Sequence, residues 1–105
     1  NFSDGFDFDT IRTLRASDIS VDHNAQKITV LAASGAKNVA LYMSQTGIIN
    51  GGRLILKDEK DSLVQKNSGS YYIMKQDGVS ESTVSADITV GGKTKTYEIT
   101  VCFAD

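Results

Sequence analysis

The stretch that decides the fold is Val84–Phe103, VSADITVGGKTKTYEITVCF, which has two glycines at its middle. A glycine pair tolerates the positive φ angles that a two-residue hairpin turn of the favoured hand requires. With Gly91 and Gly92 at the centre of such a turn, Val84 faces Ile99, and the apolar residues of the first arm share one face. The sequence therefore predicts a β-hairpin whose register is fixed by its turn and by its pattern together.

The chain has 105 residues, a mass of 11.3 kDa and the composition of one ordinary globular domain. Its formal net charge is −2, and its basic residues are scattered, apart from Lys93 and Lys95 beside the hairpin turn. Nucleic-acid binding needs a concentrated basic face, so we do not expect a nucleic-acid partner. No apolar run approaches the length of a membrane span, so we expect no transmembrane segment in this chain.

The N-terminal segment differs from the rest of the chain. Residues 1–16 open with NFSDGFDFD, which alternates aromatic and acidic side chains, and we interpret them as a linker or as a first strand. Residues 17–105 then form the sandwich domain. The chain begins at Asn1 rather than at a methionine, which fits a trimmed chain or a processed export, and a removed leader would leave no trace. We expect a secreted, periplasmic or cell-surface location, with lipid anchoring through a removed leader as one form of it.

Short β-type segments follow one another along residues 17–103, with turn signals between them. ISVD and KITVLAAS flank a polar turn, NVALYMS has apolar residues on both faces as a central strand would, and RLILK and SYYIMKQ follow. No segment shows a 3.6-residue period, although DSLVQKN could form one helical turn, and GIINGG is a glycine-rich connection. About seven short strands predict an all-β, antiparallel sandwich.

Two segments resemble the immunoglobulin superfamily. VALYM is similar to its strand C, with Leu41 in place of the buried tryptophan, and LVQKNSGSYYI is similar to the run into its strand F, with Tyr71 at the tyrosine corner. The tryptophan and both disulfide cysteines of the family are missing. The resemblance implies an immunoglobulin-like sandwich. The resemblance allows two assignments of the last hairpin. Counting the strands makes the hairpin the F–G pair. The tyrosine-corner motif instead places strand F earlier, and the hairpin then has one strand more than the family's fold.

The C-terminal run GGKTKTYEITV is similar to the last strands of immunoglobulin-like modules in secreted bacterial surface proteins, notably lipoproteins and polysaccharide-handling enzymes of Bacteroidetes. Such modules act as spacers, adhesins or carbohydrate-binding attachments. The resemblance therefore implies a partner that is a polysaccharide or another surface protein.

Neither of the two residues best suited to catalysis has a visible catalytic partner. His23, the only histidine, lies in the polar turn DHNAQ, and no nucleophile motif accompanies it. We interpret it as a solvated turn residue. Cys102 alternates with the apolar residues of the last strand, and we interpret it as a small filler rather than as a reactive thiol. We expect a non-enzymatic protein that needs no cofactor.

Two acidic clusters are candidate calcium sites. The first, in DGFDFD, offers Asp4, Asp7 and Asp9, whose carboxylates are the hard oxygen ligands that calcium takes. The second, KDEKD, is partly neutralised by its lysines. The alternative for both clusters is a solvated acidic loop.

Carbohydrate binding has candidate residues of a suitable kind, because sugars are held by aromatic rings flanked by amides and hydroxyls. The candidates are Tyr42, Tyr71, Tyr72, Asn50 and Gln76, with Tyr97 and Gln45 as further members. Tyr71 and Tyr72 must project to opposite faces of one strand. The alternative is that these tyrosines fill the core and bond through their hydroxyls. The sequence thus favours a spacer or interaction module of an exported bacterial surface protein, with a carbohydrate-binding module as the alternative.

Overall fold

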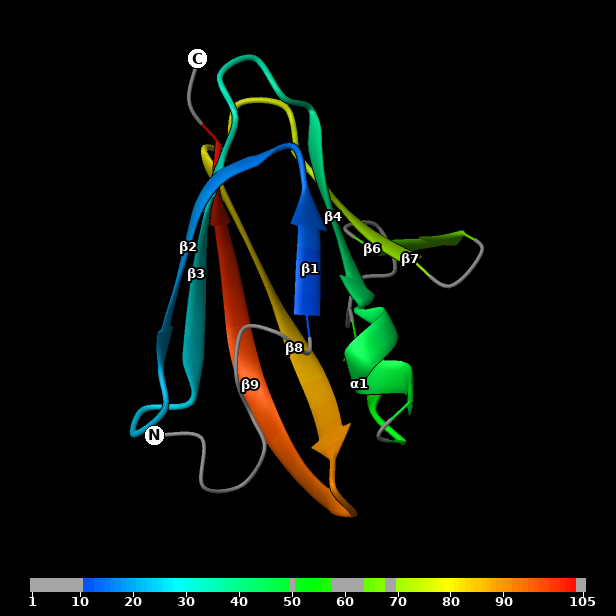
Figure 1. Cartoon of the computed structure of the whole chain (residues 1–105). Helices are drawn as coiled ribbons and strands as arrows, with labels where there is room; N and C mark the ends of the chain where they lie inside the picture. The colour runs from blue at the N-terminus through cyan, green and yellow to red at the C-terminus, as the bar shows by residue number, and fades with distance from the viewer. Residues whose placement is uncertain (1–10, 50, 58–63, 68–69, 104–105) are drawn as a thin grey trace.

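A computed structural model describes residues 11–49, 51–57, 64–67 and 70–103 of the chain. These residues form nine strands and one short helix, as follows: β1 Ile11–Leu14, β2 Ala16–Asp22, β3 Lys27–Ala32, β4 Asn38–Met43, α1 Gln45–Ile49, β5 Arg53–Lys57, β6 Val64–Asn67, β7 Ser70–Met74, β8 Glu81–Val90 and β9 Lys93–Cys102. The strands form two sheets packed face to face (Figure 1). The predicted all-β sandwich is confirmed. The described strands number nine rather than about seven because β1 and β6 each add a short strand to those expected.

One sheet has four strands in the order β1-β4-β7-β6, and the other has five in the order β2-β3-β9-β8-β5. All neighbouring strands are antiparallel except β3 and β9, which run parallel from the Lys27–Glu98 pair to the Leu31–Cys102 pair. The sandwich is therefore mixed rather than purely antiparallel. The parallel pair arises because the β2–β3 and β8–β9 hairpins lie side by side through their second strands.

The register predicted for the last hairpin is confirmed along its whole length. Val84 pairs with Ile99 and Val90 with Lys93, across a turn in which Gly91 and Gly92 have φ angles of 61° and 79°. Positive φ at both central positions is the geometry for which the glycine pair was expected. This hairpin forms the middle of the five-stranded sheet together with β3.

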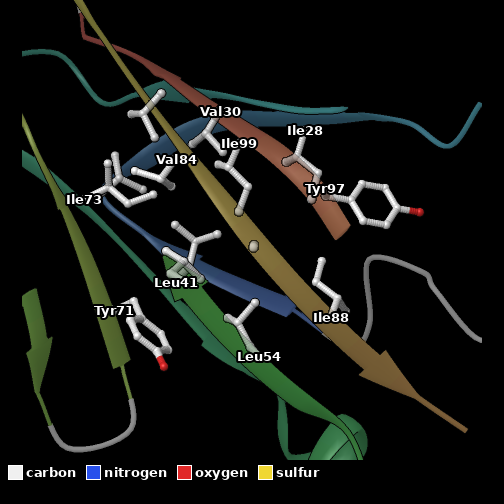
Figure 2. Close-up of a cluster of buried hydrophobic side chains, with 14 of the residues drawn as sticks. Ile28, Val30, Leu41, Leu54, Tyr71, Ile73, Val84, Ile88, Tyr97 and Ile99 are labelled. Carbon is white, nitrogen blue, oxygen red and sulfur yellow. The ribbon is translucent and has the colours of Figure 1, made fainter. Parts of the chain in front are cut away.

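The core lies between the sheets and takes alternate residues from both (Figure 2). Its most deeply buried large side chains are Tyr97, Leu41, Ile73, Ile99, Val30, Val39 and Val101. In β4 and β7 the odd-numbered residues face this core, so the even-numbered residues face outward. Each sheet thus has one outer face available for other roles.

Strands β4 and β7 are antiparallel neighbours with Leu41 opposite Tyr71. The last hairpin lies in the opposing sheet, so it does not extend the β4–β7 sheet as a strand G would.

The short helix α1 occupies part of the segment expected to be a glycine-rich connection. Its first turn is capped by Ser44, whose Oγ accepts a hydrogen bond of 3.0 Å from the Gly47 backbone N–H. The sequence did not predict helix α1 because glycine and β-branched residues are poor helix formers. The helical turn considered for DSLVQKN is a strand, β6, over its described residues.

Candidate functional site

The outer face of the four-stranded sheet brings together two of the predicted tyrosines. Tyr42 of β4 and Tyr72 of β7 both project from this face and are half-buried. Tyr42 pairs with Ser70, two residues before Tyr72, so the two tyrosines are diagonal neighbours on adjacent strands. Diagonal neighbours are roughly 7–8 Å apart, which is within reach of aromatic side chains. The two tyrosines therefore project from neighbouring positions of a single face.

Strand β1 borders this tyrosine pair. Arg12 pairs with Tyr42, and Leu14 pairs with Ala40, which in turn pairs with Tyr72. Ala40 is completely buried although it points outward, whereas Leu14 is 48% exposed. The surrounding larger side chains therefore close over Ala40, and the face is continuous from β1 to β7.

Arg15 adds a cation to this face through an unusual backbone conformation. The chain turns at Arg15 from β1 into β2 and so passes from one sheet to the other (Figure 1). Arg15 has a φ angle of 64°, in the left-handed region that glycine favours, and its carbonyl accepts a 2.7 Å bond from the Ala33 N–H. The conformation is thus fixed by tertiary structure rather than by local preference.

The Arg15 side chain is held over the tyrosine face. Its guanidinium carbon lies 5.9 Å from the centroid of the Tyr72 ring, within the range of a cation–π contact. Its Nη1 donates a 2.9 Å hydrogen bond to Oδ1 of Asn38, on β4. We name the group Arg12, Leu14, Arg15, Tyr42 and Tyr72 the tyrosine face.

Charge is distributed unequally between the two sheets. Among their described residues, the strands β1, β4, β6 and β7 carry no carboxylate, and their basic side chains are Arg12 on β1 and Lys66 on β6. The five-stranded sheet carries the carboxylates Asp18, Asp22, Glu81, Asp87 and Glu98. Over the described strands, the four-stranded sheet therefore has two cations and no carboxylate. The five carboxylates of the other sheet are equalled in number by its basic side chains, which are Lys27, Arg53, Lys57, Lys93 and Lys95.

On the five-stranded sheet, two of these carboxylates are paired with lysines. Lys57 Nζ lies 2.8 Å from Asp87 Oδ2, and this contact, with a hydrogen bond from Thr96, lowers the pKa of Asp87 below its usual range. Lys27 Nζ lies 4.0 Å from Glu98 Oε1. Both lysines thus lie close to a carboxylate of their own sheet.

The remaining predicted sugar-binding residues lie elsewhere. Tyr71 projects into the core, 8% exposed, with the Lys66 ammonium 5.6 Å from its ring centroid. Gln76 follows β7 in the loop before β8, where its carbonyl accepts a bond from the Val79 N–H. Asn50 falls outside the described residues. Tyr42 and Tyr72 are thus the two predicted sugar-binding residues that the structure brings together.

The further candidates Tyr97 and Gln45 also lie apart from the tyrosine face. Tyr97 is 2% exposed within the core (Figure 2), and Gln45 is exposed at the start of α1. Arg12, Leu14 and Arg15 were not among the sequence candidates. In the sequence, Arg12 and Leu14 are separated by one residue, so they lie on the same face of a strand. This spacing points to the site only when residues 11–14 are known to pair with β4.

His23 is less solvated than expected, although it does lie in the turn between β2 and β3. Its Nδ1 is 2.9 Å from the Tyr97 hydroxyl, and the two rings meet edge to face at 6.1 Å between centroids. Cys102 lies five residues beyond Tyr97 on β9, roughly 17 Å along an extended strand. His23 therefore does not serve as a base for this thiol.

Cys102 does not have the environment of a nucleophile. Its Sγ lies 3.8 Å from Oε2 of Glu81, and burial, followed by the charge of Glu81, raises the pKa of the thiol above its ordinary value. A thiolate would need a lowered pKa. The interpretation of Cys102 as a structural side chain agrees with this environment.

The metal candidates Asp4, Asp7 and Asp9 lie outside the described residues, as does the KDEKD cluster. Within the described ranges, no group of three or more His, Cys, Asp or Glu side chains could hold a metal ion. A hollow of about 260 Å³ at the end of the sandwich is lined by Lys75, Gly78, Val79, Ser80 and Phe103. None of the sequence candidates lines this hollow.

Comparison of the chain with family models, with curated proteins and with solved structures finds no match. In the part of the chain that the structure describes, no helix is both long enough and apolar enough to cross a membrane.

Proposed function

We propose that this domain is a non-enzymatic interaction module of an exported bacterial surface protein, and that the tyrosine face is its contact surface. The observation that carries the proposal is the position of Tyr42 and Tyr72, which are diagonal neighbours on the outer face of the four-stranded sheet. The core of the sandwich is filled by other residues of the same strands, so these two tyrosines are not part of it. The location at a bacterial surface rests on the resemblance of GGKTKTYEITV to modules of that kind.

Polysaccharide is the ligand class that this face favours. The C–H-rich faces of a sugar ring pack on aromatic rings, whose faces carry partial negative charge, while sugar hydroxyls bond to polar groups at the ring edges. The Asn38 and Ser70 side-chain positions lie on the same outer face, next to the two tyrosines. A flat sheet face of this kind suits an extended chain of sugars rather than a small enclosed ligand. A spacer without a ligand is the second candidate, favoured by a core to which both sheets contribute.

The test is a two-dimensional amide NMR titration of the labelled domain against a panel of soluble polysaccharides, with and without calcium. We expect shifts that cluster on β4 and β7 and that disappear in Tyr42→Ala and Tyr72→Ala. Ile55→Ala is the matched control, since Ile55 is a 39%-exposed apolar side chain on the outer face of the other sheet.

Three other results would contradict parts of this proposal. The absence of shifts with every polysaccharide would favour the spacer. Calcium-dependent shifts confined to the aspartates near the N-terminus would support the metal site instead. Hydrolysis of a polysaccharide that is lost in His23→Ala or Cys102→Ala would show an enzyme.

A further inference from the structure

We propose that copies of this domain associate edge to edge, with strand β5 of one copy pairing antiparallel with strand β2 of the next. The partner is thus a second copy of the chain. Because the two copies contribute different strands, repetition of the contact builds a ring or an open filament. This inference goes beyond the proposed function, since both strands belong to the five-stranded sheet and the tyrosine face belongs to the other sheet.

Among the described strands, β2 and β5 are the two ends of the five-stranded sheet. A strand at the end of a sheet presents a row of backbone N–H and C=O groups with which another strand can pair. Within one copy these two edges are separated by the width of the sheet, roughly 19 Å, so they do not pair with each other. A contact between β2 and β5 therefore requires two copies of the chain.

The directions of the two edges suit antiparallel pairing. Of the contacts that link β2 to β5 through the sheet, the β3–β9 contact is parallel and the other three are antiparallel. Strands β2 and β5 therefore run in opposite directions. A second copy that is placed beside β5 in the same orientation continues the sheet, keeps its outer face outward and presents β2 antiparallel to β5.

The two edges have segments of equal length in regular register, Asp18–Asp22 on β2 and Arg53–Lys57 on β5. When Arg53 is set opposite Asp22, residues of the same face meet at every position, because side chains alternate between faces along both strands. The resulting pairs are Arg53–Asp22, Leu54–Val21, Ile55–Ser20, Leu56–Ile19 and Lys57–Asp18.

On the outer face, this register sets opposite charges against each other at both ends. Arg53 meets Asp22 at one end, and Lys57 meets Asp18 at the other. All four residues are exposed, and opposite charges directly across two strands stabilise their pairing. Lys57 already lies 2.8 Å from Asp87, but an ammonium has three N–H donors and can bind a second carboxylate.

On the inner face, the same register sets apolar residues against each other. Leu54 and Leu56 of β5 are buried in the core. Ile19 and Val21 of β2 are partly buried and pack against the core from the other end of the sheet. Pairing with β5 of a neighbouring copy would remove more of their apolar surface from water, which favours association.

The same charges disfavour pairing of two identical edges. Two β5 strands paired residue for residue would set Arg53 opposite Lys57 at both ends. Two β2 strands would set Asp18 opposite Asp22 in the same way. Like charges directly opposite each other are destabilising, so the contact between different edges is favoured over a symmetric dimer.

The test measures self-association of the whole chain by sedimentation velocity over a range of concentrations. The contact is small, so we expect a dissociation constant of about 0.1–1 mM, with species larger than a dimer at the highest concentrations. Arg53→Glu and Asp18→Lys should each weaken association about tenfold, because each replaces an opposite-charge pair with a like-charge pair. Lys37→Glu reverses an exposed charge in the loop between β3 and β4, so it is the matched control and should associate as the wild type does.

An equimolar mixture of the two edge variants tests whether β5 meets β2. Asp18→Lys retains an unaltered β5, and Arg53→Glu retains an unaltered β2. The mixture should therefore form a dimer through one unaltered contact and grow no further, because every additional contact would involve an altered strand. A mixture that associates no more than either variant alone would overturn the proposal.

Two results with the wild type would also overturn it: sedimentation as a monomer at every concentration, and association that neither edge variant weakens. The amide spectrum of each variant reports whether it is folded. If a variant is not folded, the amide shifts of the wild type on dilution decide the question. They should cluster in Asp18–Asp22 and Arg53–Lys57, and shifts confined to other strands would show that a different surface is the contact.

Discussion

His23 Nδ1 lies 2.9 Å from the hydroxyl of Tyr97, so a turn residue bonds to one of the most deeply buried side chains of the core. The contact joins the β2–β3 turn to β9 across 74 residues of sequence. It explains how a tyrosine that is 2% exposed satisfies its hydroxyl: the ring fills the core while the polar end reaches the only histidine.

The first prediction concerns this bond. Tyr97→Phe keeps the ring and removes the hydroxyl, so we expect a loss of about 1 kcal/mol in the free energy of unfolding, measured with urea. Tyr97→Ala should cost about 3–5 kcal/mol because it also leaves a cavity. Tyr72→Phe, on the outer face, is the control and should change stability by less than about 0.5 kcal/mol. A similar loss for both phenylalanine variants would mean that the His23 contact contributes nothing specific.

The second prediction concerns the faces of the last hairpin. Ile99 is completely buried, whereas Thr100 is half-buried on the outer face, with its Oγ1 3.1 Å from that of Thr83. Ile99→Asp should destabilise the domain by more than about 4 kcal/mol or prevent folding, since it places a charge in the core. Thr100→Asp should cost about 1 kcal/mol. Thermal or urea unfolding measures both, and equal losses would show that the two faces are assigned incorrectly.

The third prediction concerns the turn of the same hairpin. A Cβ added at Gly91 would meet no atom within 4 Å, so any cost of substitution there comes from the φ angle of 61°. Gly91→Asn should leave stability within about 0.5 kcal/mol, because asparagine tolerates the left-handed region. Gly91→Val should cost about 1–2 kcal/mol for the same backbone conformation. Indistinguishable stabilities of the two variants would mean that the turn adopts another conformation.

The fourth prediction concerns the thiol. Burial and the charge of Glu81 raise the pKa of Cys102, so alkylation by iodoacetamide should reach half its maximal rate at a higher pH in the folded protein than in the unfolded chain. A pKa raised on folding contributes stability that is present below the unfolded pKa and is lost as pH rises through the folded pKa. Cys102→Ser should lack this alkaline loss.

Glu81→Gln separates the two causes of that shift. It should lower the pH midpoint of alkylation part of the way towards the unfolded value, because burial, the larger cause, remains. An alkylation midpoint in the wild type below that of the unfolded chain would instead indicate a reactive thiolate.

Much of the fold follows from local pattern. Alternation and a glycine pair suffice for the last hairpin, and apolar residues on both faces correctly indicate that β4 is a central strand between β1 and β7. The parallel contact of β3 with β9 has no comparable local signal. It joins segments that are far apart in sequence, and only the packing of two complete hairpins places them together.

In the candidate site, too, some features follow from the local sequence pattern and others only from the tertiary structure. The alternation of Tyr71 and Tyr72 required that they point in opposite directions, because successive side chains of a strand lie on opposite faces. Which of them faces outward was decided by the tertiary structure, since both faces of β7 are apolar and only the position of the second sheet distinguishes them. The partnership of Arg15 with Tyr72 depends on the left-handed turn that carries the chain from one sheet to the other. The sequence by itself determined what each strand could present, and long-range packing determined which residues it presents together.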